Sequence, residues 1–150
     1  MNIPRARAAA PAPALALSAA AAACAGLTGA VVAQAQSAAV YTDAQAQMGV
    51  NAYENNCAMC HGANMEGASG VTLLGPTFTS HYVTIGDLMQ FMVQNMPKNN
   101  PGTLSHEDYV DILAFILLKN GWPSGSQALT FGGASASRMP FAQAAPSQSQ

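Results

Sequence analysis

The sequence predicts a small all-α domain, and three observations support that fold class. Apolar residues recur at helical spacing in three separate stretches of the chain. Each stretch follows a residue type that favours a helix N-terminus, and each ends near asparagine, glycine or proline. The sequence does not show the alternation of strand and helix that is typical of a βαβ unit. We therefore expect helices packed on one another.

Length and composition limit the number of domains and the classes of partner that we expect. The chain has 150 residues, which suggests one domain, and only 8% of them are charged, with a formal net charge of −2. No basic patch is present, so we expect no nucleic-acid partner. We predict a domain at residues 43–123. Residues 124–150 are rich in alanine, serine and glutamine, and we expect a disordered tail there because they offer little apolar surface to bury.

Residues 1–35 are typical of a secretory signal peptide. Two arginines near the start precede an alanine- and leucine-rich run, and a small-x-small cleavage site ends at Ala35. We therefore expect export to the periplasm, a short linker at 36–42, and no stable membrane insertion after cleavage. Two alternatives are a retained membrane anchor, because the apolar run is long enough to span a bilayer, and lipid attachment at Cys24.

The first predicted helix covers residues 44–55. Thr42 and Asp43 precede it and are good N-cap residues. Gly49 lies inside this helix, where glycine costs about 1 kcal/mol relative to alanine. That cost indicates close approach by another element, on the face that Gly49 shares with Tyr53. A merely tolerated glycine is the alternative.

The motif that carries chemistry follows this helix, as Cys57-Ala58-Met59-Cys60-His61. It is the attachment pentapeptide of haem c. The two vinyl groups of a haem lie on neighbouring pyrroles, so the two thiols that form thioethers with them must be close, and one helical turn from Cys57 to Cys60 brings them together. His61 is then available as the proximal iron ligand. A redox-active cysteine pair and half of a zinc site are the alternatives, but a zinc site needs further ligands.

The next informative segment contains Leu74, Gly75, Pro76 and Phe78. Pro76 fixes its own φ and keeps Gly75 out of the helical region, which predicts rigid extended chain or a turn. We expect this segment to run beside the haem. Leu74, Pro76 and Phe78 are therefore predicted haem-packing residues.

Two further helices are predicted. One begins at Thr84 and must stop by Asn95, because Pro97 disfavours a helical conformation at the residue before it. The other begins at Ser105 and ends at Gly121, with acidic residues in its first turn and a proline just beyond its end.

Met96, in the loop between these helices, is the predicted distal iron ligand. Electron-transfer haems take a second axial ligand, often methionine or histidine. Met96 lies just past a helix end, in extended chain that can cover the distal face of the haem. Met92 and His81 are the alternatives. Met92 lies on a helix, where a methionine usually packs in the core, and His81 is a single loop histidine among polar neighbours.

Taken together, residues 49–122 resemble the bacterial class I cytochromes c. The matching features are Gly49-x-x-x-Tyr53, the pentapeptide with Gly62, Leu74-Gly75-Pro76-x-Phe78, Met96-Pro97 and the helix through Tyr109 to Ile116. The resemblance implies the cytochrome c fold, with three to four short helices wrapped round one covalent haem c. It implies that the N- and C-terminal helices cross, with Gly49 and Tyr53 near Phe115. It also implies that the Pro76 carbonyl accepts a hydrogen bond from His61 and that Met96 is the distal ligand.

The segment from Met96 to Pro123 is similar to small cytochromes that accompany periplasmic quinoprotein dehydrogenases. This implies a mono-haem electron carrier, not itself an enzyme, that cycles between ferric and ferrous iron. Its partners would be a dehydrogenase donor and a respiratory acceptor. Two alternatives stay open: a haem subunit fixed in a larger dehydrogenase complex, and a haem enzyme or gas-binding protein with an open distal site.

Overall fold

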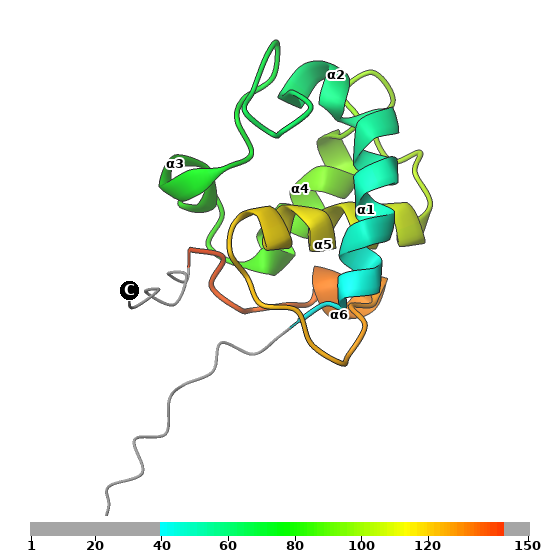
Figure 1. The fold of residues 1–150 in the computed structure, drawn as a ribbon, viewed down its shortest axis with the longest axis vertical. Coiled ribbons are helices and arrows are strands. Elements are labelled where there is room, and N and C mark those ends of the chain that lie inside the picture. Colours follow the sequence, from blue (N-terminus) through cyan, green and yellow to red (C-terminus); the bar gives the residue numbers. More distant parts are fainter. Residues whose placement is uncertain (1–39, 143–150) are drawn as a thin grey trace, which may run out of the picture. The chain divides into compact units, whose positions relative to one another are not determined.

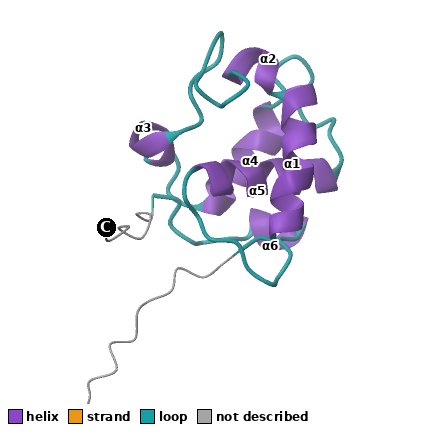
Figure 2. Cartoon of the chain, viewed as in Figure 1, coloured by secondary structure: helices purple, strands orange, loops and turns teal. Residues whose placement is uncertain are grey.

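The chain folds into six helices within residues 40–142, which are the residues that the structure, a computed structural model, describes. They are α1 (Asp43–Asn56), α2 (Ala58–His61), α3 (Gly75–Thr79), α4 (Ile85–Asn95), α5 (His106–Lys119) and α6 (Phe131–Ser135). Over this part of the chain Figure 2 shows helices and loops alone, and the backbone forms one isolated bridge, between Thr84 and Pro140. The all-α prediction is confirmed, although the helices outnumber the three to four expected. The predicted signal peptide and Cys24 lie outside the described residues.

α1 and α5 cross (Figure 1). Gly49 lies at the crossing, against the backbone of α5. A Cβ atom at Gly49 would collide with the backbone carbonyl of Asp111 and would lie 2.9 Å from Cβ of Phe115. Tyr53, one turn further along α1, meets the Phe115 ring edge-on at 5.6 Å between centroids. The close approach predicted from Gly49 is therefore confirmed, and the tolerated-glycine alternative is wrong.

The predicted starts of α1, α4 and α5 are also confirmed. Thr42 caps α1 in a capping box with Gln45, and Thr84 caps α4 in one with Asp87. Ser105 caps α5 through its hydroxyl. These side chains satisfy backbone N–H groups that have no partner within the first turn of a helix.

Residues 75–79 form the short helix α3, where we expected rigid extended chain or a turn. Pro76 lies in its first turn, where a fixed φ suits the helix and a missing N–H is harmless. Gly75 has φ +78°, a conformation that favours glycine. Leu74, before it, is extended.

The prediction of a disordered tail is wrong for residues 124–142. This segment, which we call the strap, contains α6, and its Ala134 and Phe141 are fully buried. Phe141 packs edge-on against Phe78, with ring centroids 5.5 Å apart, and also lies near Tyr82. The strap therefore orders itself on apolar surface that the rest of the domain supplies. Residues 143–150 lie outside the described residues.

Hydrogen bonds tie the strap to α1 and to the start of α4. The Gln45 side chain, on α1, donates to the Leu129 carbonyl at 2.7 Å and accepts from the Leu129 N–H at 2.8 Å. At the start of α4, the N–H groups of Ile85 and Gly86 donate to the carbonyls of Met139 (2.9 Å) and Ser137 (3.1 Å). These are first-turn N–H groups of α4, so the strap provides acceptors that the helix itself lacks.

Candidate haem-binding site

The pentapeptide sits where α1 ends and α2 begins. Cys57 is the C-cap of α1 and also the N-cap of α2. Its carbonyl accepts from the N–H groups of Cys60 (3.1 Å) and His61 (3.0 Å), so the predicted single turn between the cysteines is present. Both thiols are half-buried and unpaired. Two free thiols one turn apart, followed directly by an imidazole, match the arrangement that thioether attachment requires.

The environment of Cys57 argues against a redox-active pair. Burial, with a smaller contribution from Cys60, raises the pKa of the Cys57 thiol to about 11. The attacking cysteine of a redox pair instead has a depressed pKa, because the thiolate is the nucleophile. A zinc site has no support either, since residues 40–142 contain no group of three or more histidine, cysteine, aspartate or glutamate side chains placed to hold a metal.

His61 is buried, and one of its ring nitrogens is already engaged. Nδ1 lies 2.8 Å from the carbonyl oxygen of Val71. A carbonyl can only accept, so Nδ1 carries the proton and Nε2 keeps its lone pair. Metal-ligating histidines commonly have this arrangement, because the second hydrogen bond fixes the tautomer and the ring orientation. His61 therefore fits the role of an iron ligand through Nε2.

The prediction that His61 donates a hydrogen bond to the Pro76 carbonyl is wrong. The Pro76 carbonyl instead accepts the N–H of Ser80 at 2.9 Å, at the end of α3. Because residues 75–79 are helical, the Pro76 carbonyl points along the helix axis towards Ser80. Val71 supplies the acceptor in its place.

The loop between α2 and α3 folds back over the motif. The Gly70 N–H donates to the Cys60 carbonyl at 2.7 Å, and the Gly67 N–H donates to the His61 carbonyl at 2.7 Å. A Cβ atom at Gly70 would lie 2.9 Å from Nδ1 and Cε1 of His61. Gly70 and Val71 are thus site residues that our sequence reasoning missed. The density of glycines in this loop was the one available signal.

The three predicted haem-packing residues have different surroundings. Phe78 is buried in an aromatic cluster with Tyr82 and Phe141. Leu74 is half-buried, and Pro76 is exposed. Asn120, at the end of α5, holds this segment by donating to the Leu73 carbonyl (2.9 Å) and accepting from the Gly75 N–H (3.0 Å). The packing of Leu74, Pro76 and Phe78 against a haem stays a prediction.

Met96 follows α4 in an extended conformation, as predicted, and is half-buried. Its N–H donates to the Met92 carbonyl, and its own carbonyl accepts the Tyr109 hydroxyl at 2.6 Å. Met92 is 7% exposed and belongs to the hydrophobic core, whereas His81 is exposed beside Tyr82. Met96 as the distal ligand therefore stays a prediction.

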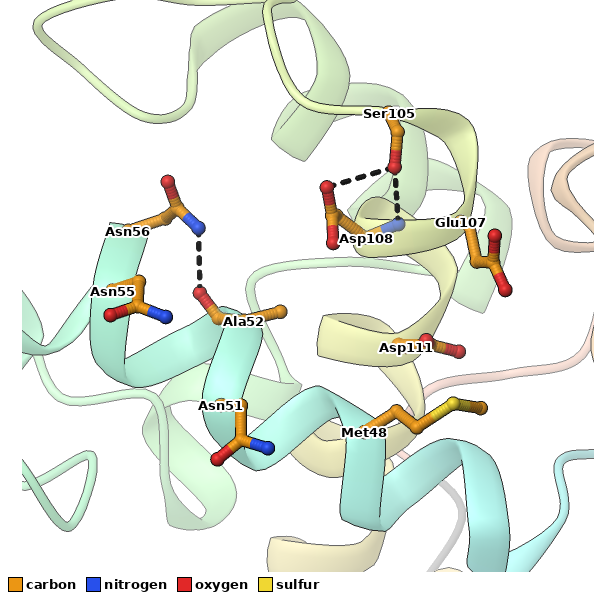
Figure 3. Close-up of a pocket in the computed structure, with 9 residues that line it drawn as sticks. All are labelled: Met48, Asn51, Ala52, Asn55, Asn56, Ser105, Glu107, Asp108 and Asp111. Atoms are coloured by element: carbon orange, nitrogen blue, oxygen red, sulfur yellow. Dashed lines mark hydrogen bonds between the residues drawn. The ribbon is translucent and has the colours of Figure 1, made fainter.

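A separate hollow of about 360 Å³ lies between α1 and the first turns of α5 (Figure 3). Most of its lining residues are polar, and none belongs to the pentapeptide: Met48, Asn51, Ala52, Asn55, Asn56, Ser105, Glu107, Asp108 and Asp111. Burial, together with the charges of Glu107 and Asp108, raises the pKa of Asp111 to about 6. This hollow is unsuited to a large apolar ring, so we do not assign the haem to it.

Comparisons with known proteins support a cytochrome c domain. Residues 44–116 match the family described as cytochrome c oxidase, cbb3-type, subunit III. The matched segment contains the pentapeptide, Met96 and most of α5. A search of curated proteins found no match. Within residues 40–142, no helix has the length and apolar character needed to cross a membrane.

A solved structure also shares the fold. It is a chain of the sulfane dehydrogenase SoxCD from Paracoccus pantotrophus, 27% identical, with a TM-score of 0.54. The alignment covers 68% of the present chain and 55% of the SoxCD chain. The present chain therefore spans little more than half the length of that relative.

Proposed function

We propose that this chain is a small cytochrome c of class I, a periplasmic electron-transfer protein with one covalent haem c that is ligated by His61 and Met96. The observation that carries the proposal is the state of His61. It directly follows two free thiols, its Nδ1 is held by the Val71 carbonyl, and Nε2 is left for iron. When bound, the haem supplies an iron that exchanges one electron between its ferric and ferrous states.

The chain's own residues have separate tasks in this proposal. Cys57 and Cys60 hold the group, because each thiol adds its sulfur and its hydrogen across one vinyl double bond. The Val71 carbonyl keeps the proton on Nδ1 of His61 and makes the imidazole a stronger donor. Met96 offers a thioether, a soft ligand that favours the reduced metal.

The surface beside the motif suits brief contact with a redox partner. Met59, between the two cysteines, is 83% exposed, and Val71 is 70% exposed. Lys98 is exposed in the Met96 loop, and it is the positively charged residue nearest to the pentapeptide along the sequence. Exposed apolar side chains beside the motif fit a transient contact with a dehydrogenase donor or a respiratory acceptor.

The experiment that tests this proposal combines intact mass with a redox titration of the exported protein. We expect the mass of the chain plus one haem, and a reversible one-electron curve followed in the visible spectrum. A Cys57→Ala, Cys60→Ala variant should carry no covalent haem. A wild-type mass without haem, or with two haems, would contradict the proposal.

The likeness to SoxCD supports a second candidate, a haem subunit of a larger dehydrogenase. The related chain belongs to a dehydrogenase structure and is considerably longer than its aligned part. Size-exclusion chromatography of the native, untagged protein separates the two candidates. Elution at the size of one chain supports a free carrier, and stable co-elution with a dehydrogenase supports a subunit. Ready binding of carbon monoxide by the reduced protein would instead support an open distal site.

A further inference from the structure

We propose that Tyr109 is the positioning residue for Met96: its hydroxyl fixes the backbone of this methionine and closes the loop that follows it. The inference rests on the proposed function, because it concerns how the predicted distal ligand is held. It adds a residue whose hydroxyl bonds the backbone of the loop.

The Tyr109 hydroxyl makes two hydrogen bonds to the loop. It donates to the carbonyl of Met96 at 2.6 Å and accepts from the N–H of Gly102 at 3.1 Å. The ring itself is 2% exposed and belongs to the hydrophobic core of the domain. A single oxygen, held by a buried ring on α5, therefore joins both ends of the loop at residues 97–101.

The backbone of Met96 is held from two sides. Its N–H donates to the Met92 carbonyl at 2.9 Å, as the last hydrogen bond of α4. Its carbonyl is held by Tyr109 on α5. With both polar groups engaged, the extended conformation of Met96 (φ −128°, ψ 149°) is fixed relative to two helices. The direction of its Cα–Cβ bond, and so the starting point of its side chain, follows from these two contacts.

The loop has few means of holding itself in place. Lys98, Asn99, Asn100 and Pro101 are all exposed. One backbone hydrogen bond, from the Asn100 N–H to the Pro97 carbonyl at 2.8 Å, lies inside it. Exposed loops with few contacts open at low free-energy cost. The Tyr109 hydroxyl is therefore placed to set how often Met96 leaves its position.

Competition by imidazole for the ferric holoprotein measures that opening. An added ligand can bind only when Met96 has moved away, so its apparent affinity scales with the open fraction. Tyr109→Phe removes both hydrogen bonds of the hydroxyl, which should raise the open fraction about tenfold or more. We expect Tyr109→Phe to tighten imidazole binding by about tenfold or more, while Tyr82→Phe leaves it unchanged. Tyr82 is the matched control because its hydroxyl makes no hydrogen bond within residues 40–142.

A second background separates a positioning role from general loosening of the fold. In Met96→Ala, no methionine competes, so adding Tyr109→Phe should leave imidazole affinity unchanged. If Tyr109→Phe raised imidazole affinity equally in the wild-type and the Met96→Ala backgrounds, the inference would be overturned. It would also be overturned if the affinity rose in neither. Gly102→Ala is a second variant that keeps the hydroxyl. Gly102 has φ +74°, where alanine is strained, so this change should also tighten imidazole binding, and an unchanged affinity would count against the loop's role.

The outcomes also separate this inference from the proposed function. A wild-type ferric protein with the methionine charge-transfer band, combined with unaltered imidazole binding in Tyr109→Phe, overturns the role of Tyr109 alone. A wild-type protein without that band, whose imidazole affinity matches that of Met96→Ala, overturns Met96 as ligand and the role of Tyr109 with it.

Discussion

His61 shows how closely a single side chain can be specified by its neighbours. Its Nδ1 faces the Val71 carbonyl, its own carbonyl accepts from Gly67, and Gly70 lies against its ring edge. The pentapeptide predicts the histidine as a ligand, but the residues that orient it come from a loop without periodicity. Their identity depends on how that loop folds back, which residue spacing does not encode.

Replacement of Gly70 tests this orientation. Gly70→Ala would place a Cβ 2.9 Å from the His61 ring and 3.1 Å from the Cys60 carbonyl, so the ring must move. We expect a lower yield of holoprotein and a shifted midpoint potential, measured by redox titration. Gly132→Ala is the control, because a Cβ there meets nothing within 4 Å. Equal potentials and yields in the two variants would show that the ring is not held by this contact.

Asp111 makes stability depend on pH in an unusual direction. Its pKa is raised from 3.8 to about 6, chiefly by burial, so the folded state binds a proton more readily than the unfolded state. Ionisation above pH 6 therefore costs folding free energy, and stability should rise as pH falls from about 7 towards 4.

The substitution Asp111→Asn isolates this effect. At pH 8 the variant should be more stable than wild type by about 1–2 kcal/mol, because it has no charge to bury. The gain should vanish near pH 4, where the carboxyl is neutral in both states. Urea unfolding of the holoprotein at both pH values measures it. A variant that is less stable at pH 8 would contradict the raised pKa.

At the scale of elements, α5 organises the domain. It crosses α1 at Gly49, holds the Met96 loop through Tyr109, and holds the segment before α3 through Asn120. The crossing was predictable, because a glycine inside a helix, one turn before an aromatic residue, indicates a close approach. The two polar contacts were not, since each joins α5 to a loop through a single side chain, with no repeated pattern.

Gly49→Ala tests the crossing. The added methyl group would collide with the Asp111 carbonyl and with Phe115, both on α5. Overpacking in a close contact typically costs about 1–3 kcal/mol of folding stability. Because the obstructing atoms belong to the backbone of Asp111, which cannot rotate away, we expect a loss at the upper end of this range. Chemical unfolding of the holoprotein measures the loss. Stabilisation, as expected for alanine in an unobstructed helix, would contradict a tight crossing at this point.

At the scale of the whole molecule, the strap extends the domain beyond the segment that matches the family model. Residues 124–142 lie past the matched segment at 44–116. Their composition predicts disorder, because isolated aromatic residues cannot form a core by themselves. Phe141 is instead accommodated by Phe78 and Tyr82, more than fifty residues away in sequence. Composition describes what a segment can bury alone, and it misses what a preformed surface can offer.

Phe141→Ala tests whether the strap stabilises the domain. Truncation of a fully buried phenylalanine typically costs about 3–5 kcal/mol, and Phe141 is fully buried. We expect a large fall in the free energy of unfolding of the holoprotein. Val83→Ala, at a side chain that is 79% exposed, should change it by less than about 0.5 kcal/mol. Equal effects of the two substitutions would mean that the strap contributes nothing to stability.

The ligation of the iron by His61 and Met96 is the central claim, and the absorption spectrum of wild type and Met96→Ala tests it most directly. The ferric wild-type protein should show the methionine–iron charge-transfer band, and Met96→Ala should lack it. Met92→Ala, at the neighbouring methionine that packs in the core, should keep the band. A Met96→Ala spectrum identical to that of wild type would contradict the claim.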